Sequence, residues 1–420
     1  MTAAPATKGW CPTLLSPMES GDGWLARVKP SAGVLSADAA RVIAGAARRY
    51  GNGHIDLTSR GNVQVRGLSP RSAEYLAEAI IDAGLASANA SFEAIRNVMA
   101  SPLGPDDPSD TFDSHAVARD IEAMLIAEPA LWGLPSKFAF VVDAGGELPL
   151  VGITADVAVR AHGGQLSVQL DGGSLGALCD RSSIADTVKA VTFALLQLSG
   201  EQSEMPRRMR TLVKAVGEEA IFAGAGLVAA PLPLAQRPEF KSPIGLISFD
   251  YPTDGAFGIG LPFGRIDADA LASLAALAER YGDGTLRTTP WRALLLIRIS
   301  PSDAGKLSHE VRALELIAES DDPRLNIFAC VGGPSCQSAS VNTRGDAGRL
   351  ASVIGVNDSI HVSGCSKSCA HRGAALLTLV GRDGRYDAIR NGSAADRPSL
   401  TGLSVDQVAV LIQSVRGQCP

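Results

Sequence analysis

Four of the chain's seven cysteines form two groups near its C-terminal end. Five residues separate Cys330 from Cys336, three separate Cys365 from Cys369, and the stretch between the groups is long enough for one helix and one strand. Thiolates are strong metal ligands, and in a reducing compartment clustered cysteines bind metals more often than they form disulfides. The grouping therefore predicts a metal centre held by these four side chains.

Two kinds of centre compete for these thiols. Structural zinc sites usually draw on cysteine pairs two to four residues apart, and the Cys-x5-Cys pair is too open for that. A four-iron, four-sulfur cube also takes four thiolates, but from a wider cage. Gly332, Gly333 and Gly364 would let the backbone approach such a cluster and donate hydrogen bonds to its sulfides. We therefore predict a [4Fe-4S] cluster rather than zinc or unconnected thiols. Cys11, Cys179 and Cys419 stand alone, which favours packed or incidental thiols.

A second group of residues is cationic and lies mostly on or beside two expected hairpins. The formal net charge is -6, so any anion site must be local. Taken singly, each cation would be an ordinary surface charge; taken together they predict a pocket for a polyanionic ligand, because guanidinium groups pair with carboxylates through two parallel hydrogen bonds. The group comprises Arg27, Arg60, Arg66, Arg96, Lys137, Arg287 and Arg292.

The elements that must position these residues occur twice. Residues 24–28 alternate as a strand, Ser36 can cap a helix that ends at Tyr50, residues 54–68 form a hairpin, and 71–83 a second helix. The same order returns with a strand at 257–261, a helix from Asp267 to Tyr281 and a hairpin at 285–297. At one constant offset, Tyr50 aligns with Tyr281, Thr58 with Thr289, and Ser69-Pro70 with Ser300-Pro301. The pattern predicts an internal duplication of a ferredoxin-like unit.

Each repeat is followed by a longer α/β segment. The first has a helix expected over 114–127, strands over 134–142, 150–160 and 165–170, and a helix over 184–199. The second contains the cysteines, strands at 376–380 and 386–389, and a last helix at 404–415. We therefore predict an α/β (α+β) fold in which two ferredoxin-like repeats form one pseudo-two-fold domain beside two larger α/β domains. The expected boundaries are 1–90, 91–235, 236–311 and 312–420.

Composition excludes several classes of protein. Among the 420 residues, 46% are hydrophobic and 20% charged, which is ordinary for a globular protein. No apolar run approaches the roughly 20 residues of a membrane helix, and residues 1–10 lack the apolar stretch of a secretory signal. Gly224-Ala-Gly226-Leu-Val-Ala229 is similar to a dinucleotide-binding loop, but it follows a helical pattern rather than a strand. We expect a cytoplasmic protein that binds neither nucleic acid nor a membrane.

Several motifs together resemble the siroheme-dependent sulfite and nitrite reductase family. They are Asp56-Leu-Thr-Ser-Arg-Gly-Asn-Val-Gln64, Arg96-Asn-Val, Leu134-Pro-Ser-Lys-Phe138 and the two cysteine pairs, and they span almost the whole chain. The resemblance implies that a tetrapyrrole lies where the three lobes meet. In the reductases this tetrapyrrole is siroheme, which is joined to the cluster through the residue matching Cys369.

Two departures point to one branch of that family. The reductases tend to carry two lysines two residues apart after the Leu-Pro; here Lys137 is kept, but Ala139 takes the second place. The usually basic position at the start of the first hairpin is Asp56. The segments 11–23, 286–292 and 362–371 resemble the precorrin-3B synthases of aerobic cobalamin biosynthesis instead.

This branch implies a substrate, precorrin-3A, whose rim carries eight carboxylates, together with dioxygen and an external electron donor. We expect carboxylates to be held by Arg27, Arg60, Arg96 and Lys137, with Thr58 and Gln64 adding hydrogen bonds and Arg287 and Arg292 serving the other edge. The resemblance also implies a mononuclear non-haem iron, for which no ligand set is recognisable in the sequence. A siroheme-dependent sulfite or nitrite reductase is the alternative enzyme, and a non-catalytic tetrapyrrole carrier is the alternative without chemistry.

Overall fold

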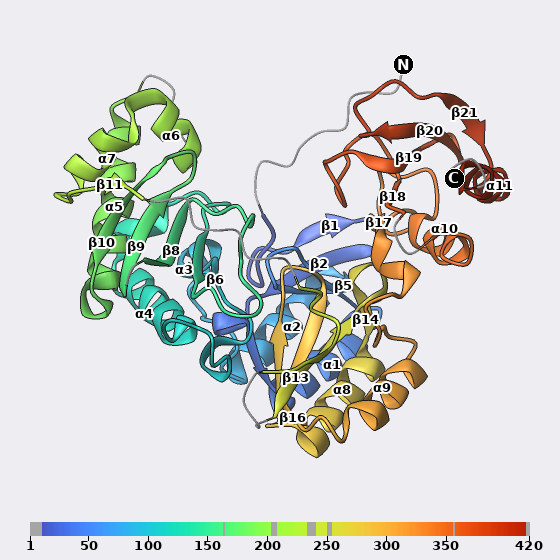
Figure 1. The fold of residues 1–420 in the computed structure, drawn as a ribbon, viewed down its shortest axis with the longest axis horizontal. Coiled ribbons are helices and arrows are strands. Elements are labelled where there is room, and N and C mark those ends of the chain that lie inside the picture. Colours follow the sequence, from blue (N-terminus) through green and yellow to red (C-terminus); the bar gives the residue numbers. More distant parts are fainter. Residues whose placement is uncertain are drawn as a thin grey trace.

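The computed structural model describes residues 11–162, 164–202, 208–232, 241–249, 254–355 and 358–416. Three lobes surround a central gap in Figure 1: the two repeats form the lower lobe, and one larger α/β lobe stands above it on each side. The expected boundary at 235/236 and Cys419 lie outside the described residues. Within the described residues, no helix is both long enough and apolar enough to cross a membrane.

The lower lobe contains two five-stranded sheets with similar strand orders. The first sheet has the order β1 (Met18–Ser20), β2 (Gly23–Val28), β5 (Val63–Leu68), β4 (His54–Leu57), β14 (Arg265–Asp267). The second has the order β12 (Gly245–Ile247), β13 (Gly255–Gly260), β16 (Ala293–Ile299), β15 (Thr285–Thr288), β3 (Val34–Ser36). The helices of this lobe are α1 (Ala37–Tyr50), α2 (Pro70–Asp82), α8 (Ala268–Tyr281) and α9 (Ala304–Ala313).

Each repeat lends one strand to the sheet of the other. β3 of the first repeat pairs with β15, and β14 of the second pairs with β4. Helices α1 and α8 pack together, and one hydrophobic core runs through both repeats. The duplication predicted from the sequence is therefore one interlocked pseudo-two-fold unit.

The helix caps differ between the repeats. The Ser36 hydroxyl accepts a hydrogen bond from the Ala39 amide at 3.1 Å, as expected for a cap of α1. Asp267 occupies the equivalent position before α8, but its carboxylate makes no capping bond. It lies 2.7 Å from His54 Nδ1 instead, and so ties the second repeat to the first.

The second lobe is built on a six-stranded sheet. The strand order is β11 (Ala230–Pro231), β10 (Leu175–Cys179), β9 (Gln165–Leu170), β8 (Val157–His162), β7 (Phe140–Asp143), β6 (Val98–Ala100). Its helices are α3 (Ala90–Ile95), α4 (Ser114–Ala127), α5 (Ile184–Gly200), α6 (Met209–Val216) and α7 (Glu218–Gly224). The strands expected over 134–142 and 150–160 begin only at Phe140 and Val157. A turn in which the Phe138 amide bonds to the Pro135 carbonyl delays the first of them.

The third lobe repeats the plan of the second. Its sheet has the order β17 (Ile327–Ala329), β18 (Ile360–Ser363), β19 (Ala375–Arg382), β20 (Arg385–Gly392), β21 (Leu400–Leu403), with helices α10 (Thr343–Leu350) and α11 (Val405–Arg416). In both lobes three parallel strands come first and antiparallel strands follow. The predicted fold class is thus confirmed.

Candidate functional site

The two cysteine pairs follow neighbouring parallel strands of the third lobe. Cys330 comes directly after β17 and Cys365 two residues after β18, and β17 pairs with β18 in parallel. Because the carboxyl ends of parallel strands meet at the same edge of a sheet, this pairing brings the two groups together. The Gly364 amide donates a hydrogen bond to the Cys330 sulfur at 3.2 Å.

The four cysteines are also close enough to influence one another electrostatically. The pKa of Cys369 is raised, first by burial and then by the negative charges of Cys330, Cys365 and Cys336. Cys369 is the exposed member, whereas the other three are half-buried. The structure therefore brings the four cysteines together at one edge of the third lobe.

Two glycines make close approach possible in this cage. Gly332 has φ = 67°, and a Cβ there would lie 2.2 Å from Thr343 Oγ1. The Thr343 hydroxyl donates a hydrogen bond to the Cys330 carbonyl at 2.6 Å, so it is fixed in place. A Cβ on Gly364 would lie 2.5 Å from the Ala339 Cβ. Larger side chains would therefore force the cysteine loops apart.

A zinc ion and an iron–sulfur cluster make different demands on the spacing of four thiols. Among the described residues, no three His, Cys, Asp or Glu side chains are grouped closely enough to hold one metal ion. Zn–S bonds of about 2.3 Å would bring thiol sulfurs to within roughly 4 Å of one another, whereas the four thiolates of a cube bind four different irons and stand further apart. The same finding leaves the mononuclear iron without a ligand set in the described part of the chain.

Part of the predicted basic group meets at the first hairpin. The guanidinium of Arg27, on β2, donates a hydrogen bond to Gln64 Oε1, on β5, at 3.1 Å, and its buried Nε has no partner among the described residues. Arg60 donates to the Lys137 carbonyl at 3.2 Å, which ties this hairpin to the second lobe. No described residue pairs with the half-buried Lys137 ammonium. These side chains could therefore receive an anionic ligand.

Thr58, which is expected to bond to the ligand, also holds the first hairpin turn. Its hydroxyl accepts hydrogen bonds from the backbone amides of Arg60 at 3.3 Å and Asn62 at 3.1 Å. Thr289, its counterpart in the second repeat, accepts in the same way from the Trp291 and Ala293 amides. Both threonines shape the hairpin turns on which the neighbouring arginines stand.

Arg96 and Arg287 are held by carboxylates of the chain itself. Arg96 is buried and pairs with Glu93 at 2.9 Å. Arg287 is buried and pairs with Asp106 at 3.1 Å. Unlike Arg27 and Arg60, these two arginines already have carboxylate partners within the described part of the chain.

Arg292 stands in an unusual backbone conformation. Its φ is 60°, in the left-handed region, and its counterpart in the first repeat is Gly61, with φ = 67°. Its side chain passes so close to Gly264 that a Cβ on that residue would lie 2.8 Å from the Arg292 Cδ. Burial lowers the pKa of Arg292, and the charges of Asp56 and Cys330 oppose that effect. A non-glycine residue in this conformation is strained, and such strain is concentrated at functional sites.

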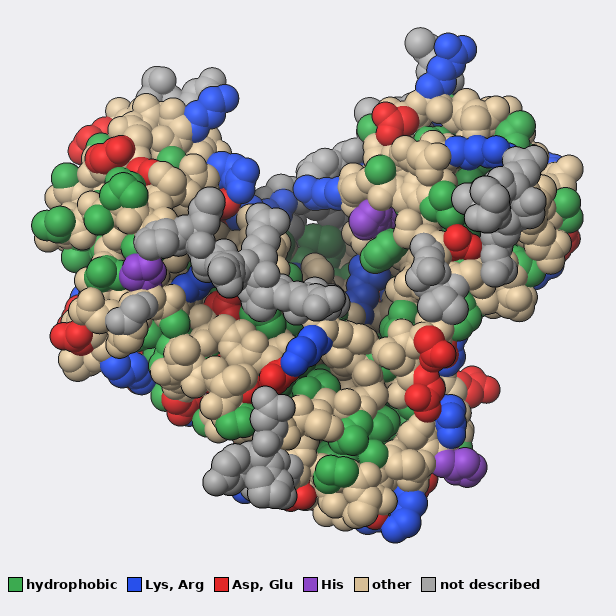
Figure 2. Space-filling model, in the orientation of Figure 1, with side chains coloured by type: hydrophobic (Ala, Val, Ile, Leu, Met, Phe, Trp, Pro, Cys, Tyr) green, Lys and Arg blue, Asp and Glu red, His purple; other side chains and the backbone are tan. Residues whose placement is uncertain are grey.

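A cavity of about 450 Å³ opens beside Arg292. It reaches from Ser59 on the first hairpin, past Trp291, to Phe328 and Ala370, which flank the cysteine pairs. Figure 2 shows the molecule hollowed where the three lobes meet, with Lys and Arg side chains around the hollow. The volume is within the range of small-molecule sites, and the lining residues lie on both hairpin turns and next to the cysteine pairs.

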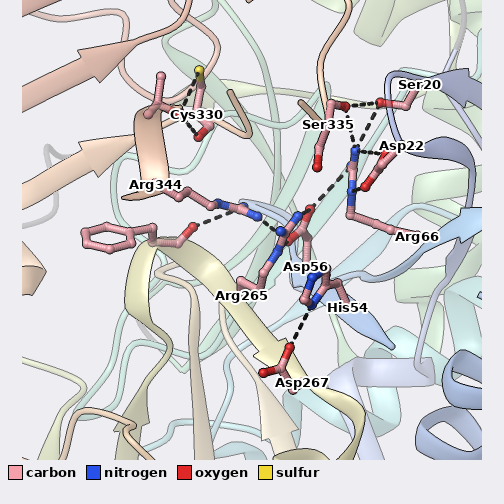
Figure 3. Close-up of polar contacts among 12 residues, drawn as sticks. Ser20, Asp22, His54, Asp56, Arg66, Arg265, Asp267, Cys330, Ser335 and Arg344 are labelled. Carbon is pink, nitrogen blue, oxygen red and sulfur yellow. Dashed lines mark hydrogen bonds and ion pairs between the residues drawn. The ribbon is translucent and has the colours of Figure 1, made fainter. Parts of the chain in front are cut away.

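Asp56 does not face this cavity as a pocket residue. It is buried and accepts hydrogen bonds from Arg344 at 2.7 Å and Arg265 at 2.8 Å, while Arg66 lies 3.4 Å away (Figure 3). Burial raises the pKa of Asp56, but the three arginines outweigh it and lower the value to about 2. Asp56 therefore serves the junction between the lobes, where it pairs with arginines, rather than the binding of a ligand.

Two residues of this region were not recognised from the sequence. Cys11, expected to be a packed thiol, is only half-buried, and its charge acts on both Arg27 and Arg60. Lys29 is buried between backbone carbonyls, and burial lowers its pKa to about 7. Lys29 directly follows β2 and lies two residues after Arg27, and this period-two spacing is the sequence signal that could have found it.

Comparisons with known proteins agree with this architecture. The model of the nitrite/sulfite reductase ferredoxin-like half domain matches residues 16–83 and 252–314. A precorrin-3B synthase from Sinorhizobium sp is 32% identical over 95% of this chain and 86% of that protein. A ferredoxin–nitrite reductase from Synechococcus elongatus is 24% identical over 87% of this chain and 77% of its own. The solved structure of NirA from Mycobacterium tuberculosis superposes with a TM-score of 0.72 at 21% identity, covering 94% of this chain and 80% of that one. The chain therefore belongs to the precorrin-3B synthase branch of the nitrite and sulfite reductase family.

Proposed function

We propose that this protein is an oxygen-dependent tetrapyrrole hydroxylase of the cytoplasm that converts precorrin-3A to precorrin-3B. The observation that carries the proposal is the position of Arg292. Its backbone is strained, and its guanidinium stands in the wall of the cavity, where the charge of Cys330 acts on it. This guanidinium makes no hydrogen bond or ion pair with the described residues. A ligand with carboxylates at its rim would supply the missing partner.

The proposed substrate contacts come from both hairpins. Arg27, Arg60 and Lys137 would hold carboxylates on one edge of the tetrapyrrole, with the Gln64 amide orienting Arg27. Arg292 would hold the opposite edge. Arg96 and Arg287 are left out of this set because carboxylates of the chain already neutralise them. Thr58 would act indirectly, by holding the turn that presents Arg60.

The proposed reaction is a monooxygenation. One oxygen atom of dioxygen becomes a hydroxyl on the meso carbon between rings A and D, and an acetate of ring A closes onto the ring as a γ-lactone. The other oxygen atom leaves as water, formed with two electrons and two protons from an external reductant. A [4Fe-4S] cluster, when held by Cys330, Cys336, Cys365 and Cys369, would relay those electrons. The residues of the cavity would bind and orient the substrate.

The surroundings of Ala139 favour hydroxylation over sulfite or nitrite reduction. This position, where the reductases tend to carry their second lysine, is 2% exposed here, and its amide donates to Asp156 at 3.0 Å. This position therefore supplies no positive charge to a ligand, unlike the lysine that the reductases tend to carry there. The overall likeness to nitrite and sulfite reductases keeps a siroheme-dependent reductase as the second candidate.

An absorption spectrum of the anaerobically purified protein separates the two candidates. We expect a broad iron–sulfur absorption without a Soret band, and its loss when any one of the four cage cysteines is changed to serine. Cys179→Ala, in the core of the second lobe, is the matched control and should keep the absorption. A Soret band from a tightly bound chlorin-like pigment would favour the reductase and contradict the proposal.

A further inference from the structure

The carbonyl of Ser335, the residue before Cys336, is a meeting point between the cysteine cage and the first repeat. It accepts three hydrogen bonds: from the Gly21 amide at 3.1 Å, the Ser20 hydroxyl at 2.7 Å and the Arg66 guanidinium at 3.0 Å. All three donors belong to the lower lobe, whereas the acceptor belongs to the third. The three donors share the two lone pairs of this oxygen and hold the carbonyl from three directions.

Arg66 is itself fixed by a carboxylate. Its Nε donates to Asp22 Oδ2 at 3.0 Å and its terminal nitrogen to Asp22 Oδ1 at 2.7 Å, a bidentate pair in which the arginine side chain is only 1% exposed. Burial raises the pKa of Asp22, but the hydrogen bond and charge of Arg66 leave it below its ordinary value. Figure 3 shows Asp22 and Ser20 on one side of Arg66 and Ser335 above it.

At Gly21 the lower and third lobes pack so closely that no side chain larger than hydrogen fits. A Cβ on Gly21 would lie 2.4 Å from the Pro334 carbonyl oxygen and 2.8 Å from the Cys336 amide nitrogen. Both of these atoms are backbone and cannot rotate away. The turn at 20–22 is therefore in direct contact with the backbone on the N-terminal side of Cys336.

We propose that Arg66, with Ser20, Gly21 and Asp22, forms a clamp that positions Cys336 in the cage and links it to the substrate-binding strand. Arg66 lies on β5 two residues after Gln64, so both side chains project from the same face of that strand. Gln64 in turn bonds to Arg27. Arg66 is thus a positioning residue, and its role toward the cluster rests on the proposed function.

The first test uses the metal-free protein and needs no cluster. After removal of iron under reducing conditions, the alkylation rates of Cys336 and Cys365 are measured by mass spectrometry. Arg66→Gln should speed the reaction of Cys336 about tenfold relative to Cys365, the factor expected for one charge-assisted hydrogen bond. Arg280→Lys, which alters another arginine–carboxylate pair of the same lobe, is the control and should change neither rate.

The second test uses the iron-loaded protein. Replacing Arg66 by glutamine leaves Asp22 without its cation and removes one of the three arginines around Asp56, so the midpoint potential of the cluster should become more negative. Arg66→Lys keeps the charge, should keep most of the potential, and serves as the variant of choice if Arg66→Gln does not fold. A ratio of the Cys336 and Cys365 alkylation rates that is the same in Arg66→Gln as in the wild type, together with an unchanged potential, would overturn the clamp. If the wild-type protein binds no iron, the proposed function fails, while the alkylation experiment still decides the clamp.

Discussion

Asp56 accepts a hydrogen bond from Arg344 across 2.7 Å, and this contact joins the first hairpin to the lobe that carries the cysteines. Arg265 brings the second repeat to the same carboxylate. A single acidic side chain thus connects three parts of the chain around the cavity. The interlocking of the repeats and this junction together explain how residues far apart in the sequence hold one site.

Removing the charge of Asp56 should destabilise the protein strongly. Asp56→Asn leaves the largely buried guanidinium groups of Arg265 and Arg344 without their anion, and Arg66 with Asp22 alone, so we expect the free energy of unfolding to fall by about 3 kcal/mol at neutral pH. Urea unfolding measures this. Asp38→Asn, which breaks an exposed pair with Arg41, is the control and should change stability by less than about 1 kcal/mol.

The same carboxylate predicts the direction of a pH effect. Its pKa is lowered to about 2 from an ordinary 3.8, so its stabilisation is present above the ordinary value and is lost as the pH falls through about 2. That stabilisation amounts to about 2 kcal/mol. The stability difference between wild type and Asp56→Asn should therefore shrink between about pH 5 and about pH 3. A constant difference over this interval would contradict the assignment.

Asp110 should affect the pH dependence of stability in the direction opposite to Asp56, because its pKa is raised rather than lowered. Both of its carboxyl oxygens are buried without a partner in the described structure, and burial, with Asp107 and Asp143 nearby, raises its pKa to about 8. Its contribution to stability is therefore lost as the pH rises from its ordinary 3.8 to about 8. Asp110→Asn should stabilise the protein by about 2 kcal/mol or more at pH near 8 and much less at pH near 5. Thermal unfolding at the two pH values measures this, and equal gains at both would refute it.

Arg292→Gly should separate binding from folding. Glycine relieves the left-handed backbone, as Gly61 does in the first repeat, so stability should be kept or rise by about 1 kcal/mol. Affinity for the tetrapyrrole should fall about tenfold or more, because a buried arginine–carboxylate pair is lost. Isothermal titration under anaerobic conditions measures the affinity.

The chain offers a matched control for this substitution. Arg298 has the same φ of 60° and is the counterpart of Gly67, but its side chain is exposed and pairs with Asp106. Arg298→Gly should relieve the same strain without changing tetrapyrrole affinity. If both variants bind equally well, Arg292 is not a substrate contact.

Arg60→Ala should weaken tetrapyrrole binding and leave the cluster's absorbance intact. Arg60 stands at the first hairpin turn, and its described hydrogen bond is to the Lys137 carbonyl. Loss of one charge-assisted contact corresponds to a decrease of about tenfold in affinity. The spectrum and the titration are recorded on the same preparation, and loss of both signals would mean that Arg60 is structural.

The sequence predicted the duplicated fold because its signals are local. Hydrophobic alternation, helix caps and the repeated Tyr-Gly-x-Gly turns locate most long elements within a few residues. The exchange of β3 and β14 between the repeats could not be predicted. Each is only three residues long, and their pairing depends on how the two units pack.

Burial decides which predicted site residues remain available to a ligand. Arg96 has its partner Glu93 three residues earlier, a spacing visible in the sequence. Arg287 meets Asp106 from another lobe, and Arg66 reaches Ser335, which lies 269 residues later in the chain, so neither contact leaves a local signal. The cysteine spacing, by contrast, already indicated the convergence that the parallel pairing of β17 and β18 produces.

The most direct test of the proposed function is incubation of the reconstituted, cluster-loaded protein with precorrin-3A, a reductant and heavy-oxygen-labelled dioxygen. Mass spectrometry of the product should show one labelled oxygen atom per tetrapyrrole, and none when the reductant is omitted. A product whose mass is unchanged, or one whose added oxygen comes from water, would contradict the account.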